Sequence, residues 1–75
     1  QVHGMTIIDY LNRMRIERAK LLLLNTDDPV VEIAMEAGFN SRQHFTRVFT
    51  SLEGISPREY RREKRNSEEK QIFLF

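Results

Sequence analysis

The chain has 75 residues, a formal net charge of +1 and no cysteine. A chain of this length forms one small domain that buries only about 60–65 % of its unfolded surface, and it has neither a disulfide nor a cluster of metal ligands to reinforce the fold. It lacks an apolar run of the roughly 20 residues that a membrane span needs, and no secretory signal opens it. We therefore expect helix packing to stabilise a cytoplasmic domain that holds no metal or other cofactor.

A long helix is predicted over residues 6–25. Thr6 and Asp9 have the spacing of a capping box, in which a hydroxyl and a carboxylate satisfy free N–H groups at a helix start. A broad apolar face carries Ile8, Leu11, Ile16, Ala19, Leu22 and Leu23, and a flanking apolar face carries Ile7, Tyr10, Met14 and Leu21. A helix that is apolar over so much of its circumference packs against more than one neighbour. We therefore expect the flanking face to contact something beyond this domain.

The second helix is predicted to begin at Asp28 and Pro29, which suit the N-cap and the first helical position. Gly38 ends this helix, and Ser41 caps a third helix that runs to about Leu52. One face of the second helix is apolar, formed by Val30, Ile33, Ala34 and Ala37. Residues at this i, i+3, i+4, i+7 spacing are expected to face the core.

A short fourth helix is predicted to begin at Ser56 and Pro57, where a second capping box has proline at its first helical position. We expect this helix to run through Arg61. Residues 62–75 then form a basic and finally apolar tail. The last residues of the tail, Ile72–Phe75, either dock on a partner or have no fixed structure.

Positive charge is concentrated in one part of the chain. Residues 40–65 carry seven basic and three acidic side chains, whereas residues 1–39 carry four basic and six acidic ones. A basic segment of this kind is the electrostatic pattern of a phosphate-binding face. A solvent-exposed helix surface produces a similar run of charges, so the pattern alone leaves both interpretations open.

The second and third predicted helices are the parts of a helix-turn-helix unit, because a tight turn containing Gly38 joins them. The third helix has an apolar side, formed by Phe45, Val48 and Phe49, and a polar side, formed by Arg42, Gln43, Thr46 and Arg47. Arginine and glutamine are side chains that bind the edges of guanine and adenine in the major groove. This arrangement predicts a helix that reads DNA.

Two segments of the chain resemble each other, Gly4-x-Thr6-x-x-Asp9-Tyr10 and Gly54-x-Ser56-x-x-Glu59-Tyr60. Each has a helix-stop glycine, a hydroxyl cap, an acidic partner and a tyrosine. If the second copy closes a helix-turn-helix unit, the first copy closes another one, which would lie upstream of Gln1. The chain, which does not begin with methionine, is therefore predicted to be a fragment.

Four motifs occur in order: Arg15-Ile16-x-x-Ala19-x-x-Leu22-Leu23, Ile33-Ala34-x-x-x-Gly38-Phe39, Phe45-x-Arg47-x-Phe49 and Gly54-x-Ser56-Pro57-x-x-Tyr60-Arg61. Over about residues 4–61 the chain resembles the C-terminal half of the DNA-binding domain of the AraC/XylS family, with Ile7 where the family often has proline. The resemblance implies an all-α fold, with a long linker helix (6–25) before a homeodomain-like helix-turn-helix subdomain of three helices (26–61). It also implies that residues 1–5 end a truncated first subdomain.

Carried over by position, the resemblance assigns base reading in the major groove to Arg42, Gln43, Thr46 and Arg47, on a recognition helix of about residues 42–52. Phosphate contacts are expected from Ser41, His44, Thr50, Arg58, Arg61 and Arg62. No neighbour completes a nucleophilic or metal-binding set around His44, so we assign no catalytic residue and expect no enzymatic activity.

The resemblance implies a bacterial transcription regulator that binds double-stranded promoter DNA. RNA polymerase is a candidate partner, and the full-length protein is expected to be a dimer. The chain alone is expected to self-associate through residues 7–24, or to cover that face with Ile72–Phe75, because soluble proteins seldom expose such a patch. The alternative is a helix-turn-helix fold that serves as a protein-interaction module, which the net charge of +1 leaves open.

Overall fold

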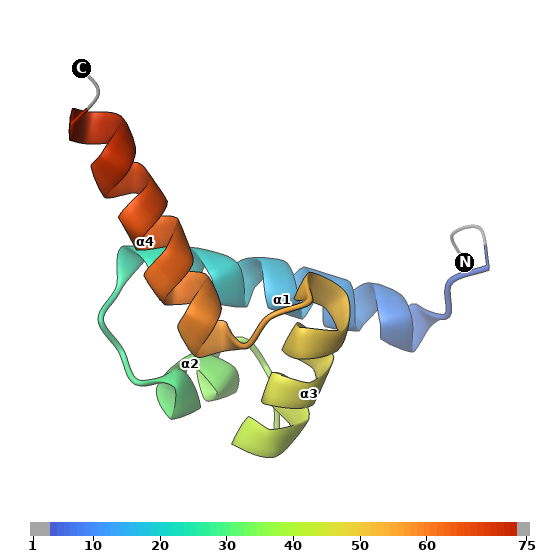
Figure 1. Cartoon of the computed structure of the whole chain (residues 1–75). Helices are drawn as coiled ribbons and strands as arrows, with labels where there is room; N and C mark the ends of the chain where they lie inside the picture. The colour runs from blue at the N-terminus through green and yellow to red at the C-terminus, as the bar shows by residue number, and fades with distance from the viewer. Residues whose placement is uncertain (1–3, 74–75) are drawn as a thin grey trace.

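The computed structural model describes residues 4–73, with side chains described as far as residue 67. This part of the chain forms α1 (Ile7–Asn25), α2 (Val30–Glu36), α3 (Arg42–Glu53) and α4 (Pro57–Phe73). The long helix α1 runs across the molecule, α2 and α3 pack against it on one side, and α4 crosses its C-terminal end (Figure 1). The expected all-α fold is confirmed.

Three side-chain caps predicted from the sequence are present. In each, a hydroxyl oxygen before a helix accepts a hydrogen bond from the N–H group three residues later. The pairs are Thr6 with Asp9 at 3.0 Å, Ser41 with His44 at 3.1 Å and Ser56 with Glu59 at 3.1 Å. These caps determine where α1, α3 and α4 begin.

The predicted start of the second helix was wrong. Pro29 is the N-cap of α2, the helix begins one residue later, and no side chain caps it. The N–H group of Asp28 donates to the hydroxyl of Thr26 at 3.2 Å, and the carbonyl of Asp28 accepts from the guanidinium of Arg61 at 2.9 Å. These tertiary and local contacts hold Asp28 in the connection between α1 and α2.

The predicted end of the last helix was also wrong, because α4 continues through residues expected to form a tail. Residues 58–71 contain no glycine or proline and consist mainly of arginine, glutamate, lysine and glutamine, which have high helix propensity. The absence of a helix-stopping residue therefore outweighed the polar character of the segment. The docking predicted for Ile72–Phe75 lies outside the residues whose side chains are described.

A row of aromatic rings forms the centre of the core. The ring centroids are 5.2 Å apart for Phe39 and Phe45, 5.7 Å for Phe45 and Phe49, and 5.5 Å for Phe49 and Tyr60. All four residues are buried, including Phe45 and Phe49 on the side of α3 predicted to be apolar. Aliphatic residues from α1, from α2 and from the C-cap of α2 complete the core: Ile16, Ala19, Leu23, Ile33, Ala34 and Ala37. Leu52 and Ile55 are partly buried against it.

Only the C-terminal part of α1 is covered by the rest of the domain. Ile8 and Leu11, predicted to share the buried face, are 69 % and 40 % exposed. The reason is that the first turns of α1 extend past the body of the molecule (Figure 1). The flanking apolar face is exposed too, with Ile7, Tyr10, Met14 and Leu21 between 46 % and 70 % accessible.

Replacement of Phe49 by alanine should lower the free energy of unfolding by about 3–5 kcal/mol, because Phe49 is fully buried between Phe45 and Tyr60. Such a loss is comparable with the whole stability of a small domain. Denaturant unfolding followed by circular dichroism measures it. Met35→Ala, at an exposed position of α2, is the control and should barely move the midpoint. An unchanged midpoint in Phe49→Ala would contradict the packing of α3.

Candidate nucleic-acid interface

The turn between α2 and α3 is held by backbone hydrogen bonds around a glycine. Gly38 has φ +102°, a left-handed conformation that glycine adopts without steric cost. The N–H group of Phe39 donates to the carbonyl of Ala34 at 3.0 Å, which satisfies a free acceptor at the end of α2. The side chain of Arg15 packs beside Gly38, since a Cβ atom there would lie 3.3 Å from Arg15 Nε. This turn sets the direction in which α3 leaves α2.

The outer face of α3 forms a shallow open groove of about 450 Å³, lined by Arg42, Gln43, Thr46, Arg47 and Thr50. The structure therefore brings together all four side chains predicted to read bases. It also places Thr50, predicted as a phosphate contact, in the same groove. The opposite side of α3 is buried through Phe45 and Phe49, so this groove necessarily faces outward.

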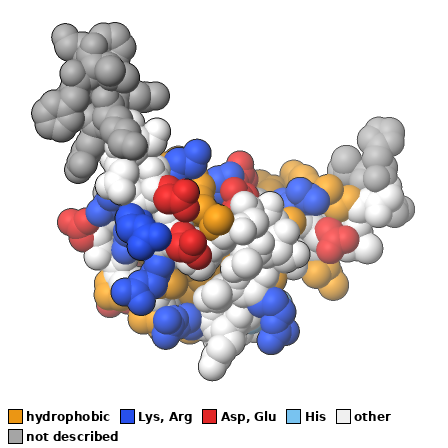
Figure 2. Space-filling view, in the orientation of Figure 1, with side chains coloured by type: hydrophobic (Ala, Val, Ile, Leu, Met, Phe, Trp, Pro, Cys, Tyr) orange, Lys and Arg blue, Asp and Glu red, His pale blue; other side chains and the backbone are white. Residues whose placement is uncertain are grey.

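Positive charge flanks the groove on both sides. Figure 2 shows blue side chains on either side of an uncharged strip over α3. Arg42 also lines a neighbouring groove with Arg58, and Arg47 also lines a groove shared with α1. The exposed face of α3 can thus present uncharged hydrogen-bonding groups at its centre and guanidinium groups at its margins.

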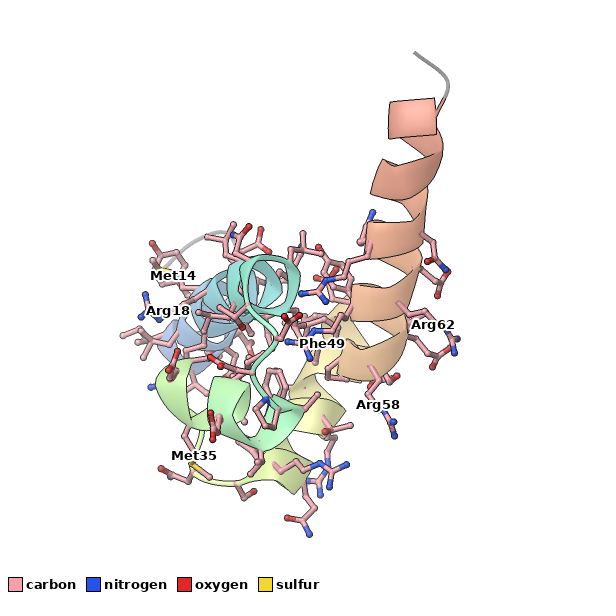
Figure 3. The ribbon with its side chains drawn as sticks, turned by 90° about the vertical axis from the view of Figure 1, so that its left-hand side faces the viewer. Met14, Arg18, Met35, Phe49, Arg58 and Arg62 are labelled. Carbon is pink, nitrogen blue, oxygen red and sulfur yellow. The ribbon has the colours of Figure 1, made fainter. Side chains whose placement is uncertain are left out.

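The other predicted phosphate contacts lie at the N-terminal end of α3 and on α4. The hydroxyl of Ser41 accepts from the N–H group of His44, and the imidazole of His44 meets the ring of Phe39 edge-on at 5.6 Å. Figure 3 shows Arg58 and Arg62 projecting from the outer side of α4. Both arginines are exposed, and Arg58 lies closer to the groove of α3 because it shares a hollow with Arg42.

Arg61 is engaged in a different way from the one the sequence predicted. Its Nε atom donates to the carbonyl of Leu23 at 2.9 Å, and its Nη2 atom donates to the carbonyls of Thr26 at 3.2 Å and Asp28 at 2.9 Å. Burial lowers the pKa of the Arg61 guanidinium from its ordinary value, but arginine stays protonated at neutral pH. Arg61 therefore ties α4 to the end of α1, and we remove it from the set of phosphate contacts.

Arg65 strengthens the same connection, and sequence reasoning missed it. Its Nη2 atom donates to the carbonyl of Thr26 at 2.6 Å, and its Nη1 atom pairs with the carboxylate of Asp27 at 2.9 Å. A signal existed, because Arg61 and Arg65 are one helical turn apart on the side of α4 that also buries Pro57 and Tyr60.

Lys20 links α1 to the end of α3, a second contact that the sequence did not reveal. Its ammonium lies 2.7 Å from the carboxylate of Glu17 and 3.3 Å from that of Glu53. The hydrogen bond that the ammonium donates to Glu17, and to a smaller extent the one it donates to Glu53, raises the pKa of Lys20. The pair with Glu53 joins residues far apart in sequence and helps to hold α3 against α1.

The residues described by the structure show neither a membrane span nor a metal site. None of their helices combines the length and the apolar character needed to cross a bilayer. None of their histidine, aspartate and glutamate side chains gather in groups of three or more that could hold a metal ion.

Two packed helices joined by a glycine turn, the second of which exposes basic and amide side chains, define a helix-turn-helix protein. Residues 1–63 match the helix-turn-helix domain family. The chain is 44 % identical over 62 residues to YisR of Bacillus subtilis (strain 168), an uncharacterized HTH-type transcriptional regulator, and this match covers 83 % of the chain and 22 % of YisR. It is 45 % identical over 58 residues to RhaS of Escherichia fergusonii, an HTH-type transcriptional activator, which covers 77 % of the chain and 21 % of RhaS.

A solved structure is also similar. The C-terminal domain of AraT, a response regulator from Geobacillus stearothermophilus, matches with a TM-score of 0.76 and 38 % identity, over 80 % of this chain and 50 % of that one. The chain belongs to the AraC-type family of helix-turn-helix proteins, which are DNA-binding transcription regulators. It spans about a fifth of the length of YisR and RhaS.

Arg61→Ala should destabilise the fold, whereas Arg62→Ala should not. Loss of the Arg61 guanidinium leaves the carbonyl of Asp28 without its side-chain donor and removes the shorter of the two hydrogen bonds to the carbonyl of Leu23, which costs about 1–3 kcal/mol. Arg62 is exposed and serves as the matched control on the same helix. Denaturant midpoints of the two variants provide the comparison, and equal midpoints would show that the contacts of Arg61 do not stabilise the domain.

Proposed function

We propose that this chain binds promoter DNA sequence-specifically, with α3 in the major groove, and thereby regulates transcription in the bacterial cytoplasm. The observation that carries the proposal is the convergence of Arg42, Gln43, Thr46 and Arg47 on one outward face of α3. An α-helix fits the major groove, where every base pair presents a distinct pattern of donors and acceptors. The buried aromatic side of α3 gives this face a fixed orientation, which base reading requires.

The four side chains of that face have different chemistry, which supports distinct roles. Arg42 and Arg47 can each donate two parallel hydrogen bonds to guanine, and Gln43 can bond adenine in the same bidentate way. Thr46 is partly buried and offers a hydroxyl and a methyl group, which suit hydrogen bonding or contact with a thymine methyl group. Each bidentate pair is worth about 1–3 kcal/mol of discrimination against the wrong base.

Phosphate contacts would surround this face and fix its register on the duplex. Ser41 and His44 lie at the N-terminal end of α3, where helix N–H groups and the helix dipole favour an anion. Thr50 lies in the groove itself, and Arg58 lies beside Arg42. Arg62 is exposed one turn beyond Arg58 and would reach the backbone farther along. This set omits Arg61, whose guanidinium is already bound within the protein.

The chain would act as one part of a longer regulator, because it spans only about a fifth of YisR and RhaS. In this proposal α1 is the linker helix, residues 26–61 form the second reading unit, and residues 1–5 end the first. RNA polymerase is the candidate partner of the bound regulator, and the longer protein is expected to be dimeric.

A protein-interaction module is the second candidate function. The exposed apolar face of α1 favours it, since Ile7, Met14 and Leu21 are each more than half accessible, and contiguous patches of this kind commonly mark protein interfaces. Duplex binding separates the two functions. For a DNA-binding domain, the logarithm of the affinity for duplex DNA falls linearly with log[salt]. An interaction module would not bind the duplex in this way.

Replacement of Arg42 or Gln43 by alanine in the longer protein should relax the base preference at one or two operator positions. Arg62→Ala should instead weaken binding to all sequences alike and lower the salt slope by about one. Selection from randomised duplexes, followed by affinity titrations at several salt concentrations, measures both effects. The assignment of the reading face is wrong if the Arg42 and Gln43 variants keep the parental preference at every position.

The exposed face of α1 should make the isolated chain self-associate, and this follows from its accessibility to water. Sedimentation should show concentration-dependent association, which Met14→Lys reduces and Val31→Lys, on α2, does not.

With one reading helix, the chain should bind DNA only in the micromolar range or weaker.

Adding about fifty upstream residues should restore tight binding to a site that spans two major grooves. A strictly monomeric chain, or equal affinity of the short and long forms for the operator, would refute this expectation.

A further inference from the structure

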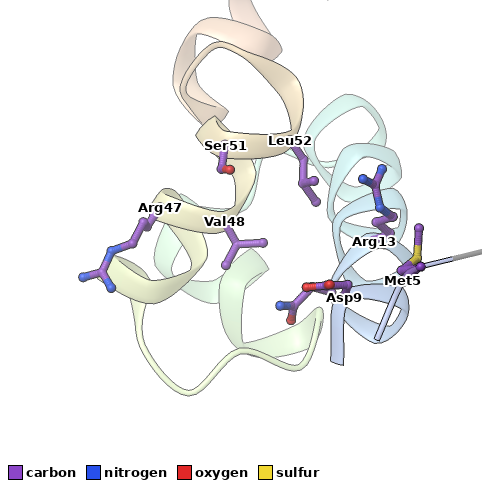
Figure 4. Close-up of a pocket in the computed structure, with 9 residues that line it drawn as sticks. Met5, Asp9, Arg13, Arg47, Val48, Ser51 and Leu52 are labelled. Atoms are coloured by element: carbon purple, nitrogen blue, oxygen red, sulfur yellow. The ribbon is translucent and has the colours of Figure 1, made fainter. Parts of the chain in front are cut away.

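A second groove, of about 490 Å³, lies between the N-terminal half of α1 and the adjacent flank of α3. Figure 4 shows Asp9 and Arg13 on the α1 side and Val48, Ser51 and Leu52 on the α3 side. Asn12 also lines the groove. Together with Arg47, these residues line the groove with two cations, an amide, a hydroxyl and one carboxylate over an apolar floor.

This groove is continuous with the reading face. Arg47 lines both hollows, and its guanidinium points away from the groove, toward the outer side of α3 (Figure 4). A surface that begins at Gln43 and Thr46 thus passes over Arg47 and reaches Asn12 and Arg13 on α1. No motif of the sequence placed α1 beside α3 in this way.

Arg13 is an available cation within this surface. It is exposed, and within residues 4–67 no ion pair or side-chain hydrogen bond involves it. The two carboxylates on its other side, Glu17 and Glu53, are both bound by Lys20. The guanidinium of Arg13 can therefore bind an external anion without breaking a contact within the fold.

We propose that Arg13, with Asn12 and Ser51, binds the sugar-phosphate backbone at the rim of the major groove that α3 reads. The inference rests on the proposed function of α3. A helix in the major groove, which is about 12 Å wide, occupies the groove itself. An element that lies beside this helix then meets the phosphates along the rim. The arginine, amide and hydroxyl groups of this surface are all donors that contact DNA phosphates.

Asp9 provides a second test of the proposal, in which the expected change in DNA affinity has the opposite sign. Its carboxylate lies in the same groove and would repel a phosphate bound there. Arg13→Ala should therefore weaken duplex binding, and Asp9→Asn should strengthen it. A purely structural role of these exposed residues would not produce opposite effects on affinity.

The matched control for Arg13 is Arg18, on the same helix. Figure 3 shows Arg18 beside Met14, on the side of α1 away from α4, and Arg18 does not line the groove. Arg13→Ala and Arg18→Ala remove the same charge from the chain, so a difference between them reports position and not net charge. Arg13→Lys keeps the charge and should recover most of the lost affinity.

Fluorescence anisotropy of the chain with a labelled duplex, titrated at several salt concentrations, measures these effects. Arg13→Ala should reduce the slope of log affinity against log[salt] by about 0.9, several times more than Arg18→Ala does. Base preferences should not change. Equal slopes for the two variants would overturn the proposal while leaving the reading face intact, whereas no salt-dependent binding by the parent chain would overturn both.

A series of duplexes, each with one neutral methylphosphonate linkage at a different position, identifies the phosphate that Arg13 contacts. One linkage at the rim of the site should weaken the parent several-fold and leave Arg13→Ala unaffected. If every linkage affects both proteins equally, Arg13 does not contact the backbone.

Discussion

The position of α3 depends on the row of aromatic rings from Phe39 through Phe45 and Phe49 to Tyr60. Each ring meets the next at a centroid distance between 5.2 and 5.7 Å, within the range of favourable edge and tilted contacts. Because Phe45 and Phe49 are one turn apart on α3, their burial fixes the rotation of the helix about its own axis. The side chains on the opposite side, including Gln43 and Arg47, are therefore presented outward by the core.

A second constraint comes from α4, which holds the connection between α1 and α2. The guanidinium groups of Arg61 and Arg65 bind three backbone carbonyls and one carboxylate in the last turn of α1 and in this connection. Free carbonyls at a helix end otherwise need a cap or water, and here a distant helix supplies the donors. The packing of α4 and the start of α2 are thus coupled.

Much of the fold could be predicted from local sequence signals. Hydroxyl caps, the Gly38 turn and helical periodicity act over three to seven residues, and the predictions built on them for α1, α3 and the start of α4 were confirmed. The end of α4 was predicted wrongly for a local reason, since no helix-stopping residue follows Arg61. The start of α2 was predicted wrongly because a distant contact decides there: the carbonyl of Asp28 is bound by Arg61. Similarly, the sequence showed which side chains face outward on α3, but not that Arg13 of α1 lies in the adjoining groove.

The contacts of Arg61 have a consequence for how this domain can vary among relatives. The acceptors in these contacts are backbone carbonyl oxygens, which every amino acid provides. The side chains in the connection between α1 and α2 can therefore change without loss of the hydrogen bonds to Arg61. The donor cannot vary in the same way, because lysine lacks the planar, multidentate geometry of a guanidinium. Substitutions should therefore be tolerated among the residues that supply the carbonyls and strongly restricted at Arg61.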